Sequence, residues 1–137
     1  MGNRILVDLQ RCTGCWTCVL ACKVGNGLAD DEWWSTVRTL GSGEGIDRPA
    51  GIWPNLHMEW MPVYTKSCIM CAPRVKEGFD PYCAHNCPVR AISFGDPEDP
   101  KSDFSTKLTE LKGKGFRVFQ LPEWENTKRE VFYASKK

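Results

Sequence analysis

The stretch Cys12-Thr-Gly-Cys15-Trp-Thr-Cys18-Val-Leu-Ala-Cys22 decides the fold, because its four cysteines follow the spacing C-x2-C-x2-C-x3-C. A second group, Cys68-Ile-Met-Cys71 followed by Cys83-Ala-His-Asn-Cys87-Pro88, repeats this order with its second gap lengthened to eleven residues. The two groups contain all eight cysteines of the chain. Cysteines this closely spaced on a curling loop can direct several thiolates at one centre, so the pattern predicts metal binding.

The spacing of the first group favours an iron–sulfur cluster over a single metal ion. A [4Fe–4S] cluster takes four thiolates, and in two-cluster ferredoxins the fourth cysteine of each run ligates the other cluster. By that rule cluster A is expected on Cys12, Cys15, Cys18 and Cys87, and cluster B on Cys22, Cys68, Cys71 and Cys83. The sequence therefore predicts two [4Fe–4S] clusters that use all eight thiols.

Two zinc sites and a disulfide framework are the alternatives to this interpretation. Zinc sites pair two C-x2-C units and do not need three cysteines at x2, x2 with a fourth at x3. Disulfides are rare in a reducing compartment. Pro88 supports the iron–sulfur interpretation because a proline after the last cysteine ends the local helix, and Gly14 can let backbone amides turn inward.

Length and charge limit the class of protein. A chain of 137 residues predicts one domain. A formal net charge of +1 argues against a nucleic-acid partner or an anionic membrane surface, which need a strongly basic face. The first residues do not show the pattern of a signal peptide, and the sequence has no apolar run of roughly 18 residues. We therefore expect a cytoplasmic protein without membrane insertion, although export together with a signal-bearing partner would also agree with the sequence.

The pattern around the cysteines predicts an α+β fold. The core is expected to resemble a two-cluster bacterial ferredoxin with pseudo-twofold symmetry, since strand, cysteine loop and helix occur twice. The expected elements are a strand over 3–9, a helix over 16–24, a helix over 69–77 and a strand over 91–94. This core would span residues 1–24 and 66–95.

Two regions lie outside the expected core. Residues 25–65 form an insert that is rich in tryptophan and contains a Gly-rich stretch over 41–45; its aromatic rings either pack on the core or form a docking surface. Residues 96–137 form a C-terminal docking extension. Within it Phe104, Leu108 and Leu111 predict a one-faced helix that stops at Gly113, followed by strand-like runs over 116–121 and 130–134.

Three stretches resemble the iron–sulfur subunits of the DMSO reductase family of molybdenum and tungsten bis-pterin oxidoreductases. They are Ile5-Leu-Val-Asp8-Leu-Gln-Arg-Cys12-Thr-Gly-Cys15, Cys68-Ile-Met-Cys71-Ala-Pro-Arg74-Val-Lys-Glu-Gly78 and Pro81-Tyr-Cys83-Ala-His-Asn-Cys87-Pro88-Val-Arg-Ala91-Ile. Typical members carry four cysteine motifs, whereas this chain resembles only the first and the last. The tail partly matches the family's C-terminal sequence, at Pro122-Glu and at Val131-Phe-Tyr133. It differs at Asn126 and Arg129, where the family has Gly and Pro.

The resemblance implies a non-catalytic electron-transfer subunit of anaerobic metabolism, bound to a large Mo/W bis-pterin catalytic subunit. It also implies an orientation, with cluster A nearest the catalytic subunit and cluster B facing outward toward a further electron carrier. The alternatives are a free-standing 2[4Fe–4S] ferredoxin and a subunit whose clusters are structural beside a redox-neutral partner. Cations close to the cysteines in sequence would favour the reduced clusters, or are solvated loop charges: Arg11, Lys23, Lys66, Arg74 and Arg90.

Overall fold

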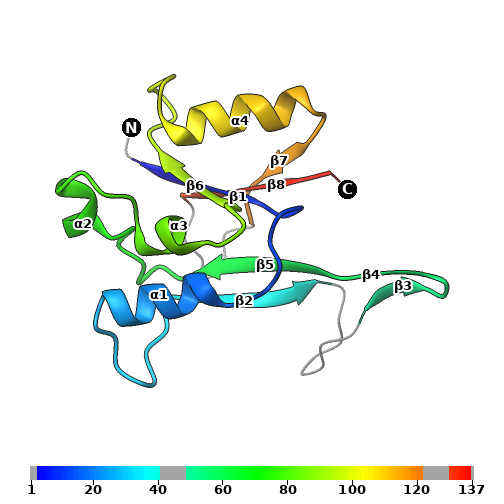
Figure 1. Cartoon of the computed structure of the whole chain (residues 1–137), viewed down its shortest axis with the longest axis horizontal. Coiled ribbons are helices and arrows are strands. Elements are labelled where there is room, and N and C mark those ends of the chain that lie inside the picture. Colours follow the sequence, from blue (N-terminus) through cyan, green and yellow to red (C-terminus); the bar gives the residue numbers. More distant parts are fainter. Residues whose placement is uncertain (1–2, 41–48, 122–129, 137) are drawn as a thin grey trace.

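The computed structural model describes residues 3–40, 49–121 and 130–136. The Gly-rich stretch 41–45 and positions 122, 126 and 129 lie outside the described residues. The described elements follow in the order β1 (Arg4–Asp8), α1 (Thr17–Gly25), β2 (Ser35–Leu40), β3 (Ala50–Ile52), β4 (Asn55–His57), β5 (Glu59–Tyr64), α2 (Ala72–Lys76), α3 (Tyr82–Asn86), β6 (Ile92–Gly95), α4 (Asp103–Gly113), β7 (Arg117–Phe119) and β8 (Val131–Ser135). The fold is therefore a small mixed α/β fold (Figure 1).

A four-stranded sheet in the order β6-β1-β8-β7 forms the centre of the molecule. Strand β1 runs antiparallel to β6, with Arg4 opposite Gly95 and Val7 opposite Ile92. On its other side β1 runs parallel to β8, with Ile5 opposite Val131. The C-terminal residues thus supply a strand inside the sheet rather than an appendage at its edge.

Alternating side chains of β1 join two separate hydrophobic clusters, because successive residues of a strand point to opposite faces of the sheet. Ile5 and Val7 belong to the larger cluster, which also includes residues of β2 and β5. Leu6 belongs to a smaller cluster with Phe104 and Leu111 of α4. Figure 1 shows α4 along one face of the sheet and the β2–β5 ribbon on the other side. Each fully buried aliphatic side chain of β1 contributes about 1.5–3 kcal/mol.

The ribbon formed by β2 and β5 and the hairpin formed by β3 and β4 come from the expected insert. Figure 1 shows the hairpin carried outward beyond the end of the ribbon. The tryptophans divide between two environments: Trp34 and Trp60 are half-buried against the larger cluster, whereas Trp53 in the hairpin is 80% exposed. Packing on the core thus accounts for some of these rings and not for others.

The helix over the second cysteine motif is shorter than expected. Met70 and Cys71 have φ angles of 53° and 51°, so α2 begins only at Ala72. Helix α3, which the sequence pattern did not predict, starts directly after Pro81. Proline is favoured at a helix start because its fixed φ suits the first turn and its missing N–H is not needed there.

Helix α4 ends at Gly113, as the sequence predicted. Its first turn is capped by the Ser102 hydroxyl, which accepts a hydrogen bond of 3.2 Å from the Ser105 amide. A serine at this position satisfies an amide that the helix itself leaves without an acceptor. The cap fixes where the helix begins, and so where Phe104 meets the sheet.

A buried hydrogen bond joins the sheet to the ribbon. The Tyr133 hydroxyl in β8 donates to the Pro62 carbonyl oxygen in β5 at 2.6 Å. Burial of this hydroxyl raises the pKa of Tyr133, so it is a proton donor at any physiological pH.

We expect Tyr133→Phe to lower the free energy of unfolding by about 1–3 kcal/mol, because the Pro62 carbonyl would be left buried without this donor. Chemical denaturation of the purified protein measures this. Tyr82→Phe, which removes the hydroxyl of a half-buried tyrosine, is the matched control and should change the free energy by less than about 0.5 kcal/mol. Equal effects of the two substitutions would contradict the bridging role of Tyr133.

Candidate metal centres

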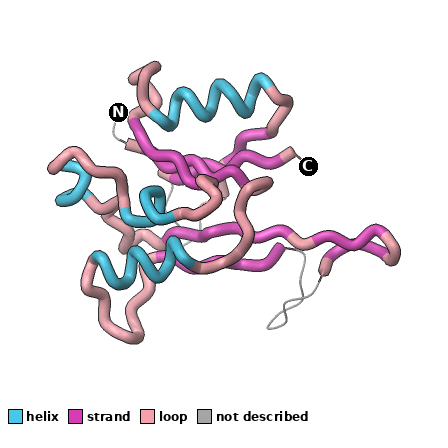
Figure 2. The backbone as a smooth tube through the Cα atoms, viewed as in Figure 1, coloured by secondary structure: helices cyan, strands magenta, loops and turns pink. Residues whose placement is uncertain are grey.

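The first centre is a pocket at the end of β1. It is lined by four thiols together with apolar side chains of the ribbon: Cys12, Cys15, Cys18, Cys87, Val37 and Pro62. The first motif begins in the loop between β1 and α1 (Figure 2) and continues into α1, which carries Cys18 and Cys22. Cys87 enters the same pocket because it precedes β6, and the antiparallel pairing of β1 with β6 puts the end of one strand beside the start of the other.

Gly14 is required in the loop of the first centre. Its φ is +69°, a conformation that L side chains rarely adopt, and a Cβ there would lie 2.5 Å from the Trp60 ring. The loop can therefore press against β5 only with glycine at this position. This contact holds the loop that carries Cys12 and Cys15 against the ribbon.

The second centre gathers the other four cysteines. The thiols of Cys68 and Cys71 lie near enough to the Cys22 thiol in α1 to help raise its pKa. They help to raise the pKa of the Cys83 thiol in α3 in the same way. All four side chains are buried. Packing of α1 against α3 brings the end of the first motif to the second motif.

In the described structure, Cys87 of the second motif thus joins three cysteines of the first motif, and Cys22 of the first motif joins three cysteines of the second. These are the groups that the spacing predicts. The two centres are neighbours, since the Cys83 thiol also interacts with that of Cys18. The ligand sets themselves stay a prediction.

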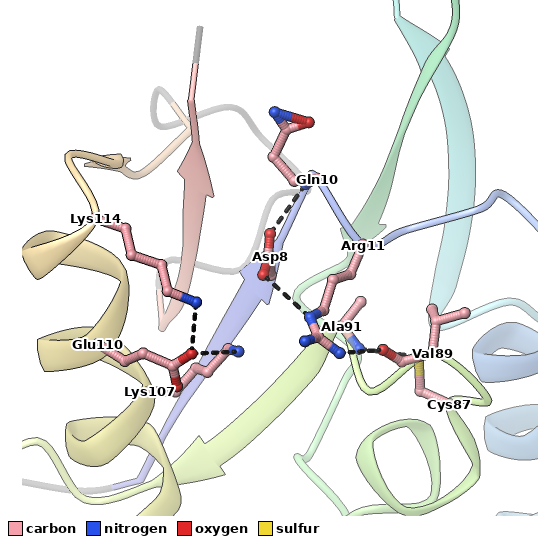
Figure 3. Close-up of polar contacts among 9 residues, drawn as sticks. All are labelled: Asp8, Gln10, Arg11, Cys87, Val89, Ala91, Lys107, Glu110 and Lys114. Atoms are coloured by element: carbon pink, nitrogen blue, oxygen red, sulfur yellow. Dashed lines mark hydrogen bonds and ion pairs between the residues drawn. The ribbon is translucent and has the colours of Figure 1, made fainter.

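Hydrogen-bond donors point at the sulfur atoms from the surrounding chain. The Met70 amide donates to Cys68 Sγ at 3.3 Å. The Ala91 amide donates to Cys87 Sγ, also at 3.3 Å, as Figure 3 shows. Residues with positive φ, among them Met70 and Arg90, bend the backbone near these amides. Amides turned inward in this way stabilise negative charge on sulfur.

Asn26 is a donor that sequence reasoning missed. Its side-chain amide lies 3.7 Å from both Cys22 Sγ and Cys71 Sγ, so it connects the two motifs within the second centre. The same amide donates to the Cys22 carbonyl oxygen at 3.0 Å. Its place four residues after Cys22, which puts both on one helix face, is the signal that could have identified it.

Burial shifts the acidity of most of these thiols. It raises the pKa of Cys18 to about 12 and that of Cys22 to about 11, and it raises the pKa of Cys83 further. Cys15 differs because it is exposed, and a hydrogen bond with the Thr17 hydroxyl lowers its pKa. Thiols buried without positive charge stay protonated at neutral pH, so thiolates form at these positions only together with bound metal.

Three of the expected cations make contacts with the chain itself. Arg11 lies 3.8 Å from the buried Asp8 carboxylate and donates to the Val89 carbonyl at 3.4 Å, which ties the first motif to the second (Figure 3). Lys23 donates to three carbonyl oxygens of the loop after α1 and lies over the Trp33 ring. Arg74 donates to the Asp80 carbonyl and lies over the Tyr82 ring. Arg11 and Arg74 thus brace segments next to the cysteines, and Lys23 braces the loop that follows α1.

The donor set fits an iron–sulfur cluster better than a single ion. Within the described residues no three His, Cys, Asp or Glu side chains converge closely enough to hold one metal ion, whereas zinc would need four thiolates at about 2.3 Å from one point. Four thiols lining a pocket, with amides aimed at sulfur, suit a larger inorganic core. All eight cysteines are free of disulfides.

Comparison with known families agrees with this geometry. Residues 53–97, which include the four cysteines of the second motif, match the family described as the 4Fe-4S dicluster domain. Fold, thiols and match together make this chain an iron–sulfur protein with 4Fe–4S clusters.

The chain is also similar to named subunits of oxidoreductases. It is 28% identical to a Halobacterium salinarum protein with the provisional name of dimethyl sulfoxide reductase iron-sulfur subunit, over 94% of this chain and 43% of that one. It is 32% identical to the formate dehydrogenase-O iron-sulfur subunit of Escherichia coli, over 81% and 28%. It is 28% identical to a sulfite dehydrogenase subunit of Allochromatium vinosum, over 88% and 39%. The chain therefore spans less than half the length of these relatives.

These relatives confirm the resemblance drawn from the cysteine motifs. Two of the three are iron–sulfur subunits by name, in agreement with the expectation of an electron-transfer subunit that is not itself the catalytic chain. In the described part of the chain, no helix combines the length and the apolar character that a bilayer crossing requires.

Gly14→Ala and Gly27→Ala test the close approach of the first motif to Trp60. Both glycines have positive φ, at +69° and +64°, but the space at Gly27 is open. The strained backbone should cost about 1–2 kcal/mol of unfolding free energy in each variant, and overpacking should add about 1–3 kcal/mol only in Gly14→Ala. Thermal denaturation measures the difference; equal losses would contradict the steric requirement at Gly14.

Proposed function

We propose that this chain is an electron-transfer subunit that carries two [4Fe–4S] clusters and passes single electrons to or from a pterin-dependent Mo/W catalytic subunit. The observation that carries the proposal is the convergence of eight thiols in two neighbouring groups of four, each with one member from the other motif. Cluster A would be held by Cys12, Cys15, Cys18 and Cys87, and cluster B by Cys22, Cys68, Cys71 and Cys83.

When bound, each cluster would supply a one-electron couple, so that the pair can serve a two-electron catalytic site. The chain's own residues would bind the clusters, shield them from water and set their reduction potentials. The amides of Met70 and Ala91 and the side chain of Asn26 would donate to the ligating sulfurs and favour the more negative, reduced form. The buried cysteines of the second centre would exclude water.

The proposed core has the pseudo-twofold arrangement of a two-cluster ferredoxin, with an aromatic insert and a C-terminal docking extension. What supports this is the repeated order of strand, cysteine loop and helix, with β1 and β6 paired and α1 packed on α3. Free cysteines and the proposed clusters favour a reducing cytoplasm. Export together with a signal-bearing partner would be compatible with the same core.

The catalytic partner is proposed from the names of the relatives and from one surface. The first centre opens at Cys15, and beside it Trp16 and Leu20 are 40% and 54% exposed. Apolar side chains exposed around a metal centre are typical of a docking surface. We place the catalytic subunit against this surface, nearest cluster A, and a further electron carrier nearest cluster B.

Paired substitutions test the crossed ligand sets. In Cys22→Ser/Cys71→Ser both changes fall in cluster B, so about four iron atoms per chain should remain. In Cys22→Ser/Cys12→Ser the changes fall in different clusters, so both clusters should be lost or degraded. Iron and sulfide analysis with EPR of the reduced protein measures the outcome. If each motif instead held its own cluster, the iron contents of the two variants would be reversed.

Leu20→Asp tests the docking surface. Leu20 lies on the exposed face of α1, so the substitution should leave iron content unchanged and reduce the recovery of the large subunit roughly tenfold in affinity purification from the native host. Thr109→Asp on α4, on the other side of the sheet (Figure 1), is the control and should leave that recovery unchanged. Recovery of the wild-type chain as a cluster-loaded monomer without a larger chain would contradict the proposed partner.

A further inference from the structure

Tyr64, at the end of β5, has a buried hydroxyl group whose presence apolar packing of the core does not explain. It is 3% exposed, and within the described residues its hydroxyl is a buried polar atom that no hydrogen-bond partner of ordinary geometry satisfies. Tyr133, the other buried tyrosine, shows the usual solution, since its hydroxyl donates to the Pro62 carbonyl at 2.6 Å. A buried hydroxyl without a partner is destabilising, so its retention calls for a physical reason.

The Tyr64 hydroxyl lies against the two centres. Tyr64 packs in the same buried cluster as Cys83 of the second centre and Cys18 of the first. After burial itself, these two thiols contribute most to the raised pKa of Tyr64, but no hydrogen bond of ordinary geometry joins the hydroxyl to either of them. The hydroxyl therefore lies where the two groups of cysteines meet, close to the sulfur atoms of Cys83 and Cys18.

Cys83 differs from its neighbours in what surrounds its sulfur. It is 5% exposed, the lowest value among the eight cysteines. Cys68 has the Met70 amide as a donor, and Cys22 and Cys71 share the Asn26 side chain. For Cys83 the described residues offer the Tyr64 hydroxyl as the side-chain donor.

We propose that Tyr64 is a positioning residue whose hydroxyl donates a hydrogen bond to the Cys83 sulfur and raises the reduction potential of the cluster that Cys83 holds. The inference rests on the proposed function. A neutral thiol is a weak acceptor, but a metal-bound thiolate is a strong one, so the unsatisfied hydroxyl gains its partner when the centre is loaded. A donor to sulfur stabilises the more negative state, which is the reduced one.

The effect is confined to one of the two couples. Of the two thiols, Cys83 of the second centre has the larger influence on the pKa of Tyr64 and Cys18 of the first centre the smaller. A hydroxyl has one proton and donates to one sulfur at a time. The cluster of the second centre therefore gains the stabilisation.

Tyr64→Phe in the full, cluster-loaded chain tests the proposal by redox titration followed by EPR. We expect unchanged iron content and one couple moved to a more negative potential, with its reduced-to-oxidised ratio lowered about tenfold at a fixed potential. For a one-electron couple this is about 59 mV. Tyr133→Phe removes the same group from a tyrosine bonded to a carbonyl and should leave both couples unchanged.

Fluorinated tyrosine gives a second measurement that does not depend on the folding of the Phe variant. The chain has three tyrosines, and replacing all three with 3-fluorotyrosine makes each hydroxyl a stronger donor. The same couple should then move to a more positive potential.

The outcomes separate this inference from the function on which it rests. Wild-type protein without iron and sulfide would overturn the proposed function itself. Clusters that reduce normally, with unchanged couples in both Tyr64→Phe and the fluorinated protein, would overturn only the role of Tyr64. Equal shifts of both couples, or the same shift in Tyr133→Phe, would also overturn it.

Discussion

Five of the eight thiols are buried in a chain of only 137 residues, and the rest of the structure depends on that constraint. A buried thiol stays neutral at physiological pH, because burial opposes the charged form. Thiolate at such a position needs positive charge or donors nearby, and the inward amide of Met70 and the side chain of Asn26 supply donors. The buried residues therefore position sulfur ligands as well as forming an apolar core. On the proposed function, the bound clusters would occupy the space between these thiols.

The central sheet determines which cysteines can meet. Strand β1 leads into the first motif and β6 leaves the second, and the Asp8 amide donates to the Ala91 carbonyl oxygen at 2.7 Å where the two motifs adjoin. Antiparallel pairing of these strands makes the approach of Cys12 and Cys87 a consequence of register rather than of loop flexibility. Strand β8 holds β1 from the other side, so the C-terminal strand supports a site to which it contributes no cysteine.

Local sequence patterns predicted what depends on neighbours along the chain. The pattern around the first cysteines predicted a helix over 16–24, which is α1, and the apolar period with Gly113 predicted α4 and its end. The central place of β8 could not be predicted, because it depends on pairing with β1 across most of the chain. The shortening of α2 could not be predicted either, since positive φ at Met70 and Cys71 follows from wrapping the thiols. Arg11 and Arg74 were visible as cations, but only the fold shows that they hold loops.

The two centres differ in exposure, and this difference gives the molecule a direction. The first centre reaches the surface through Cys15, whose pKa is lowered by the Thr17 hydroxyl, whereas all four thiols of the second are buried. On the proposed function, the first centre would exchange electrons through the surface around Cys15 and Trp16, whereas the four thiols of the second centre are buried. Tyr64 packs against cysteines of both centres, among them Cys18 and Cys83. On the proposed function, a hydrogen bond from Tyr64 to Cys83 stabilises the reduced form of the cluster in the second centre. The electron would then reside preferentially on the buried cluster rather than on the one near the surface.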